Sequence, residues 1–341
     1  MVIKLMHDAS PATEHAPSPS AYLWLATVPL IWGSHFVFLK IVYEDYTVMG
    51  MLSLRYLLMS VALWVVLWVT ERDLRFDLKD VPYLAFFSLL MVTIYQVLFA
   101  LAIQWSSAGE SALLISTAPI FTAFTAAILG WERLTRRMTA GIALGFAGIT
   151  AVILGGSGLS YLPPTHVKGC LVMVVSAVLW AWYAVLAKPL LSRYSPVKVT
   201  TYCHTLGGIP LILLGAPDAL HTTPQVIAHL ADPLTQGHAL WVIAGILFYA
   251  WLSGSYAFTV WYRAVQRLGS GRTMMFQYCV PVVGLLAAIV FRREYPSLVQ
   301  WVGVALTLCG VFFAAARPQV SAVPVAATDR SEIVDGPDTA C

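Results

Sequence analysis

Ionisable side chains are rare in the long apolar segments of this chain, and three of them are candidates for chemistry. His35, Arg55 and His204 each lie within a segment long enough to cross a lipid bilayer as a helix. Such groups are costly in lipid, so they often mark a binding site or a path for protons. A histidine could hold a substrate or a proton, and an arginine could bind a carboxylate through two parallel hydrogen bonds. The structural alternatives are a packed histidine and an arginine that pairs or extends to the membrane surface.

Aromatic and amide side chains in the same apolar segments could form the walls of a pocket. Trp32 and His35 are one helical turn apart and share a face, and Trp180 and Tyr183 repeat this spacing later in the chain. Small-molecule sites combine apolar walls with a few hydrogen-bonding groups. Taken singly, each residue could instead make a contact between helices. The predicted substrate-binding residues are Trp32, His35, Tyr95, Gln96, Trp180, Tyr183, Tyr256, Gln277 and Tyr278.

Charged residues at segment ends and prolines inside segments are candidates for gating. Glu110 and Arg272 begin two apolar segments at nearly equivalent positions, and with Arg55 and His204 they form the predicted gating set. A carboxylate at a helix N-terminus is also favoured by the helix dipole, which explains Glu110 without a gate. Pro119 and Pro281 each remove a backbone hydrogen bond, so they could act as hinges or as structural kinks.

The composition requires a membrane around these segments. Of 341 residues, 59% are hydrophobic and only 11% are charged, whereas soluble domains have about 25% charged residues. Apolar segments long enough to cross a bilayer predict transmembrane helices, because a helix satisfies the backbone polar groups within lipid. We predict an all-α integral membrane protein with ten transmembrane helices. The predicted spans are 22–40, 48–70, 82–104, 108–129, 138–155, 168–190, 197–215, 239–266, 271–291 and 297–316.

The distribution of basic residues predicts the orientation. Lys and Arg are concentrated at one set of alternate loops, so we predict a multi-pass protein of the plasma membrane, which is the inner membrane in a bacterium, with both termini in the cytoplasm. Residues 1–21 and 317–341 are predicted to be disordered cytoplasmic tails. The segment Ala216–His238, which contains Pro and His but no Lys or Arg, is predicted to be a loop.

The two halves of the chain repeat each other, at 22–155 and 168–316. Gln104 and Gln266 are 162 residues apart, and the same offset relates Pro119 to Pro281, Glu132 to Glu294, Gly141 to Gly303 and Gly148 to Gly310. Five spans is an odd number, so the two repeats would enter the membrane in opposite directions. Inverted repeats of this kind support alternating access in secondary transporters.

These motifs resemble the EamA family of the drug/metabolite transporter superfamily over nearly the whole chain. The resemblance rests on Ile31–Val37, Leu54–Leu58, Gly109–Ala112 with Pro119, and Gly130–Leu134, and on the repeated Pro281, Glu294, Gly303 and Gly310. It implies a ten-helix transporter with a central cavity that commonly exports amino acids or other metabolites. Where the family often has Asn, this chain has His35.

Other functional classes fit the sequence less well. No Gly-rich GKS/T loop, HExxH or GxSxG motif occurs, so we predict neither an ATPase nor another enzyme, with no catalytic residue, cofactor or metal. The net charge of +3 gives no indication of nucleic-acid binding. The predicted partners are lipid and a small-molecule substrate, and coupling of transport to protons is possible. An uptake permease and a non-transporting scaffold or sensor are the alternatives, and neither substrate nor oligomeric state follows from the sequence.

Overall fold

The computed structural model of the chain describes residues 19–71, 74–118, 120, 121, 125, 136–155, 163–268, 273 and 276–315. Regular secondary structure in these residues is helical, which confirms the predicted all-α class. Six helical segments are long and apolar enough to cross a membrane: Tyr22–Val42, Val48–Thr70, Val81–Trp105, Pro164–Leu191, Pro196–Ala231 and Gln236–Leu268. Shorter apolar helices cover Thr139–Gly155, Cys279–Arg292 and Leu298–Gly310.

The helices of the first half cover four of the predicted spans, whereas the span at 108–129 is described as a helix over Ala108–Ile115 and lies largely outside the described residues beyond 121. They are α2 (Pro19–Val42), α3 (Val48–Thr70), α4 (Val81–Ser88), the π-helix η1 (Leu89–Ile94), α5 (Tyr95–Trp105), α6 (Ala108–Ile115) and α8 (Arg136–Gly155). Apart from residues 19–21, which begin α2, the predicted N-terminal tail lies outside the described residues, as does the C-terminal tail.

The described residues of the second half are also helical. They are α9 (Pro164–Leu186), α10 (Lys188–Leu191), α11 (Pro196–Ala228), the 3-10 helix η2 (His229–Ala231), α12 (Gln236–Leu247), the π-helix η3 (Phe248–Tyr256), α13 (Ala257–Leu268), the 3-10 helix η4 (Phe276–Tyr278), α15 (Cys279–Ala287), the π-helix η5 (Ala288–Arg292) and α16 (Leu298–Ala315).

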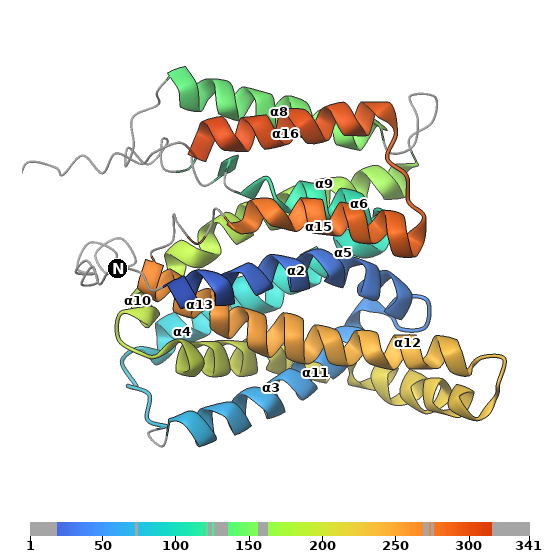
Figure 1. The fold of residues 1–341 in the computed structure, drawn as a ribbon. Coiled ribbons are helices and arrows are strands. Elements are labelled where there is room, and N and C mark those ends of the chain that lie inside the picture. The colour runs from blue at the N-terminus through green and yellow to red at the C-terminus, as the bar shows by residue number, and fades with distance from the viewer. Residues whose placement is uncertain are drawn as a thin grey trace, which may run out of the picture.

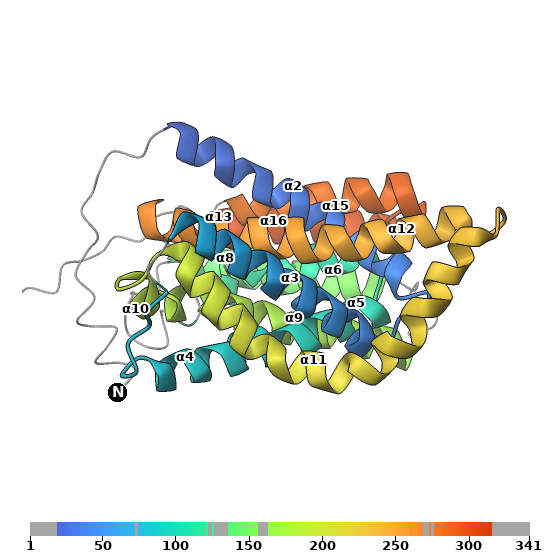
Figure 2. The same cartoon turned by 90° about the horizontal axis from the view of Figure 1, so that it is seen from below.

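Helices from the two halves pack against each other throughout the molecule. On one side α8 lies along α16, on the opposite side α3 lies along α11, and α2, α15, α5, α9 and α13 fill the space between them (Figures 1 and 2). Each of these outer pairs joins one helix from each half. The central layer is therefore enclosed by segments from both halves.

Glycines allow the close approach of α8 and α16. A Cβ atom added at Gly148 would lie 2.3 Å from Oγ1 of Thr307, and one at Gly303 would lie 2.9 Å from the carbonyl oxygen of Gly148. At Gly310 the added atom would lie 2.5 Å from the backbone nitrogen of Gly145. The glycines at 145, 148, 303 and 310 thus form a helix-packing surface, as small residues commonly do in membrane proteins.

The prediction of a loop at Ala216–His238 is wrong for most of that segment. Helix α11 continues to Ala228, and at about 1.5 Å per residue its 33 residues extend about 50 Å, well beyond a bilayer core of about 30 Å. With α12 it forms a hairpin that projects from one end of the bundle (Figures 1 and 2). Contacts to the α2–α3 connection hold this extension, because Thr47 donates to Asp218 at 2.7 Å and Tyr46 donates to Thr223 at 3.0 Å.

Candidate functional site

A cavity lies in the central layer, between helices of both halves. It contains about 370 Å³ of space that atoms do not fill, part of which is open to the surroundings. Helices α2, α3, α5, α6, α9, α13 and α15 contribute side chains, as do the π-helix η3 and the 3-10 helix η4. The lining residues are Trp32, His35, Phe36, Arg55, Tyr95, Gln96, Phe99, Ile115, Trp180, Tyr249, Ser253, Phe258, Gln277 and Val280.

Arg55 supplies a permanent positive charge to this cavity. Its side chain is only 1% exposed, so it does not extend to the membrane surface. The guanidinium carbon lies 3.8 Å from the ring centroid of Tyr249 and 5.1 Å from that of Tyr56. These ring faces stabilise the cation. However, Nε and Nη1 have no hydrogen-bond partner among the described residues, and no described residue of the lining is acidic. A buried charge in this state lacks the counter-ion that normally offsets its loss of water.

His35 lies near Arg55 with one nitrogen bonded and the other free. Its Nδ1 is 3.2 Å from the hydroxyl of Ser253, whereas Nε2 has no partner among the described residues. The ring contacts Phe36, Phe99 and Tyr249, with centroid separations of 4.4, 5.6 and 5.5 Å. This histidine is thus oriented by a hydroxyl and by aromatic packing, and it keeps one nitrogen for another partner.

Aromatic rings form one wall of the cavity. Trp32 donates its indole N–H to the backbone oxygen of Ser253 at 3.0 Å. Its ring lies 5.3 Å from both Trp180 and Phe258, measured between centroids, and 5.2 Å from Trp261. These rings come from α2, α9 and α13, so the wall spans both halves. The arrangement gives a rigid apolar surface of the kind that lines ligand sites.

Amide groups supply further hydrogen-bonding capacity. Gln96 donates to the hydroxyl of Tyr249 at 3.2 Å, which orients the ring that faces Arg55. Gln277 lines the cavity with its Oε1 unpartnered among the described residues, and the indole nitrogen of Trp180 is also unpartnered there. Unbonded polar atoms in a buried site are costly unless water or a ligand satisfies them.

The structure brings together most, but not all, of the residues predicted from the sequence. Tyr183 and His204 lie behind the aromatic wall, with the Tyr183 hydroxyl 3.4 Å from Nε2 of His204. His204 also contacts the backbone oxygen of Thr200 at 2.9 Å. Tyr256 faces elsewhere, with its hydroxyl 2.9 Å from that of Thr27. The predicted residues that line the cavity are Trp32, His35, Arg55, Tyr95, Gln96, Trp180 and Gln277.

Some of the predicted gating and hinge residues lie outside the described residues, and others lie away from the cavity. Arg272, Pro119 and the side chain of Tyr278 lie outside the described residues, while Pro281 is buried within α15. Glu110 does not line the cavity. It closes a capping box with Ser107 at the start of α6, which is the structural alternative considered for it.

Several lining residues were not among those predicted. Tyr249, Ser253, Phe258 and Phe99 are residue types found throughout apolar helices, so their identity alone does not single them out. Tyr249 and Ser253 lie in the π-helix η3, where the wider turn changes which side chains share a face. The sequence carries no simple pattern for this local widening.

Comparison with known proteins identifies the family. The EamA-like transporter family model matches residues 19–154 and 167–316. The chain belongs to this family. It is 27% identical over 296 residues to an uncharacterized transporter of Archaeoglobus fulgidus, a match that covers 87% of this chain and 97% of that one. EamA-like proteins are transporters, so the expectation that this protein is not an enzyme is confirmed.

Two relatives have names that state the class of compound they transport. A probable terminal-alkyne amino-acid exporter of Streptantibioticus cattleyicolor is 28% identical, with 86% of this chain and 92% of that one covered. A probable amino-acid metabolite efflux pump of Salmonella typhimurium is 23% identical, with 84% and 91% covered. A solved crystal structure shares the fold, with a TM-score of 0.59 at 21% identity over 86% of this chain and 98% of that chain.

Proposed function

We propose that this EamA-like protein is a secondary transporter that exports small metabolites bearing a carboxylate, such as amino acids or related compounds. The named relatives that act on amino acids support the substrate class, and the polar groups that line the cavity support a solute that forms hydrogen bonds. The observation that carries the proposal is Arg55, a buried cation that lines the cavity with two unpartnered nitrogens and no acidic neighbour in the described lining.

A carboxylate on the solute would supply the counter-ion and the hydrogen-bond acceptors that Arg55 lacks in the described lining. Hydrogen bonds between a guanidinium and a carboxylate are charge-assisted and roughly twice as strong as neutral ones. The wall of Trp32, Trp180 and Phe258 would contact the apolar part of the solute, and Gln277 would bond a polar group on it. The free Nε2 of His35 could bond the same solute or carry a coupling proton.

The architecture supports alternating access between the two halves. We propose ten membrane helices in two inverted five-helix repeats, at 22–155 and 168–316, in a plasma membrane with both termini cytoplasmic. The family match over two segments supports the repeat, as does the packing of α3 on α11 and of α8 on α16. Because the cavity is built by both halves, a rocking motion of one half against the other would expose it to each side in turn.

Counterflow in proteoliposomes tests this function. Purified protein would be loaded with unlabelled solute and offered radiolabelled amino acids, each compared with its amide derivative, which lacks the carboxylate. We expect saturable counterflow of at least one free acid and little of its amide. Arg55→Gln should abolish the preference for the acid. Equal transport of acid and amide would refute carboxylate recognition, and no counterflow of any amino acid by folded protein would refute the function.

A further inference from the structure

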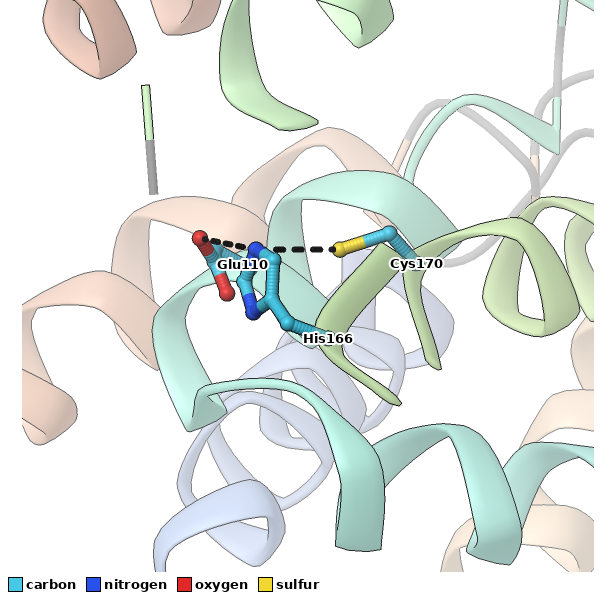
Figure 3. Close-up of side chains that lie close together, drawn as sticks. All are labelled: Glu110, His166 and Cys170. Atoms are coloured by element: carbon cyan, nitrogen blue, oxygen red, sulfur yellow. Dashed lines mark hydrogen bonds and ion pairs between the residues drawn. The ribbon is translucent and has the colours of Figure 1, made fainter. Parts of the chain in front are cut away.

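Three metal-ligating side chains meet away from the cavity, where α6 and α9 begin (Figure 3). Oε1 of Glu110 lies 3.5 Å from Nε2 of His166, and that nitrogen lies 3.8 Å from Sγ of Cys170. All three ligand atoms are within 4.8 Å of one another. His166, which the sequence analysis did not single out, lies one turn before Cys170 on α9, so both side chains share a helix face.

Two of the three separations between ligand atoms are compatible with a tetrahedral metal site. Bonds of about 2.0–2.3 Å from zinc to oxygen, nitrogen and sulfur place neighbouring ligand atoms about 3.4–3.6 Å apart. Two of the observed separations, 3.5 and 3.8 Å, are near this value. The 3.5 Å separation of Glu110 and His166 is longer than a typical N–H···O hydrogen bond of about 2.7–3.2 Å, whereas 3.8 Å between His166 and Cys170 is also within reach of a weak hydrogen bond to sulfur.

Neighbouring groups hold the carboxylate in position. The backbone N–H of Ser107 donates to Oε2 of Glu110 at 3.1 Å, and Gln300 of α16 donates to Oε1 at 2.8 Å. Hydrogen bonds of this kind orient the ligands of metal sites. Glu110 and Cys170 are buried, while the His166 side chain is 16% exposed, which leaves a route for an ion and for a water as fourth ligand.

We propose that Glu110, His166 and Cys170 bind a divalent transition-metal ion of the zinc type. The mixed oxygen, nitrogen and sulfur donors favour zinc over magnesium or calcium, which prefer oxygen ligands only. The ion would join α6 of the first half to α9 of the second. In the orientation proposed above, this end of the bundle faces the outside.

A bound ion would also regulate transport, a consequence that rests on the proposed function. An ion that binds one arrangement of α6 and α9 more tightly than another shifts the population toward that arrangement. Because alternating access requires the two halves to move, zinc would then slow the turnover of the transporter.

Zinc binding can be measured without any transport assay. Purified protein would be titrated with Zn²⁺ by calorimetry, and with Co²⁺ to detect the charge-transfer absorption of a thiolate–cobalt bond. We expect one ion per chain, no binding of Mg²⁺ at the same concentration, and an affinity reduced about tenfold or more in His166→Gln and Cys170→Ser. Cys170→Ser should also lose the cobalt band. Cys309→Ser, which removes an exposed cysteine on α16, and His221→Gln, which removes an exposed histidine on α11, are the matched controls.

The thermal midpoint without metal establishes that each variant is folded. Failure of folded wild type to bind Zn²⁺, or equal affinity in wild type, His166→Gln and Cys170→Ser, would overturn the site. Inhibition of counterflow by Zn²⁺ that is relieved in Cys170→Ser would establish regulation. If Zn²⁺ binds but counterflow is unchanged, regulation is refuted and the site stands. If the protein binds Zn²⁺ and transports nothing, only the proposed function fails.

Discussion

Arg55 and Glu110 are both buried charged residues, yet their surroundings differ. Glu110 accepts hydrogen bonds from the backbone of Ser107 and the side chain of Gln300, so the protein supplies a donor to each carboxylate oxygen. Arg55 is surrounded by aromatic rings and keeps two nitrogens without partners among the described residues. The first arrangement fixes helix ends in place, and the second leaves a charge available to something that enters the cavity.

This difference shows that the burial of a charged side chain does not by itself reveal whether the residue serves stability or function. The two buried charges have different energetic consequences, because removing Glu110 breaks hydrogen bonds, whereas removing Arg55 loses ring contacts but also removes two unpartnered buried nitrogens. Substitutions at the two sites should therefore separate stability from function.

The largest effect is expected for Arg55→Gln. If Arg55 binds the carboxylate of the solute, losing a charge-assisted interaction of about 3 kcal/mol lowers the transport efficiency about a hundredfold. The thermal midpoint in detergent should stay the same or rise, because an incompletely paired buried charge has been removed. Counterflow rates and thermal unfolding on the same preparation would measure both.

Arg292→Gln is the matched control for Arg55→Gln. Arg292 bonds Glu44 at 2.8 Å and is 32% exposed, so its loss should change neither measurement strongly. A marked fall in stability of Arg55→Gln, with transport lost only in proportion to unfolded protein, would contradict a role for Arg55 in binding.

Glu110→Gln should show the reverse pattern. The capping box with Ser107 and the bond from Gln300 are weakened, and loss of a helix cap costs about 0.5–2 kcal/mol. We expect a thermal midpoint lower by a few degrees and counterflow within about threefold of wild type once folded protein is counted. Unchanged stability together with lost transport would place Glu110 in the transport path.

The sequence predicted the polar part of the cavity because polar residues are unusual in apolar helices. His35, Arg55, Gln96 and Gln277 could be identified for that reason, and all four line the cavity. Phe258 could not, since a phenylalanine in an apolar helix carries no distinguishing signal. The extension of α11 beyond Ala216 was missed because prolines favour loops in sequence, while here hydrogen bonds from Tyr46 and Thr47 hold the extension against the α2–α3 connection.

The cluster of Glu110, His166 and Cys170 illustrates a different limit. His166 and Cys170 have a helical spacing that the sequence displays, but that spacing is common and predicts no metal by itself. The third ligand comes from another helix, and only the packing of α6 on α9 brings it close. A site of this kind depends on tertiary contacts that no local pattern records.

A smaller effect is expected for Tyr249→Leu. The ring centroid lies 3.8 Å from the guanidinium carbon of Arg55, and a buried cation–π contact is worth about 1–2 kcal/mol. Without this ring Arg55 loses its orientation, so we expect the KM for the carboxylate solute to rise about five- to tenfold. Tyr249→Phe keeps the ring and removes only the hydroxyl that accepts from Gln96, so it should stay closer to wild type. Equal behaviour of the two variants would show that the ring face is not what positions Arg55.

Among the substitutions in the cavity, the smallest effect is expected for Ser253→Ala. Its hydroxyl lies 3.2 Å from Nδ1 of His35, while its backbone oxygen, which accepts from Trp32, is unaffected. Losing one neutral hydrogen bond costs about 1 kcal/mol, so we expect counterflow to fall about threefold to fivefold with little change in stability. Ser255→Ala is the matched control, because Ser255 lies on the same π-helix but bonds the backbone oxygens of Met59 and Ala250. If His35→Ala abolishes transport while Ser253→Ala has no effect, the imidazole acts through its unpartnered Nε2, and its orientation by Ser253 is unimportant. If both variants match wild type, His35 is a packing residue and Arg55 is left as the polar anchor of the cavity.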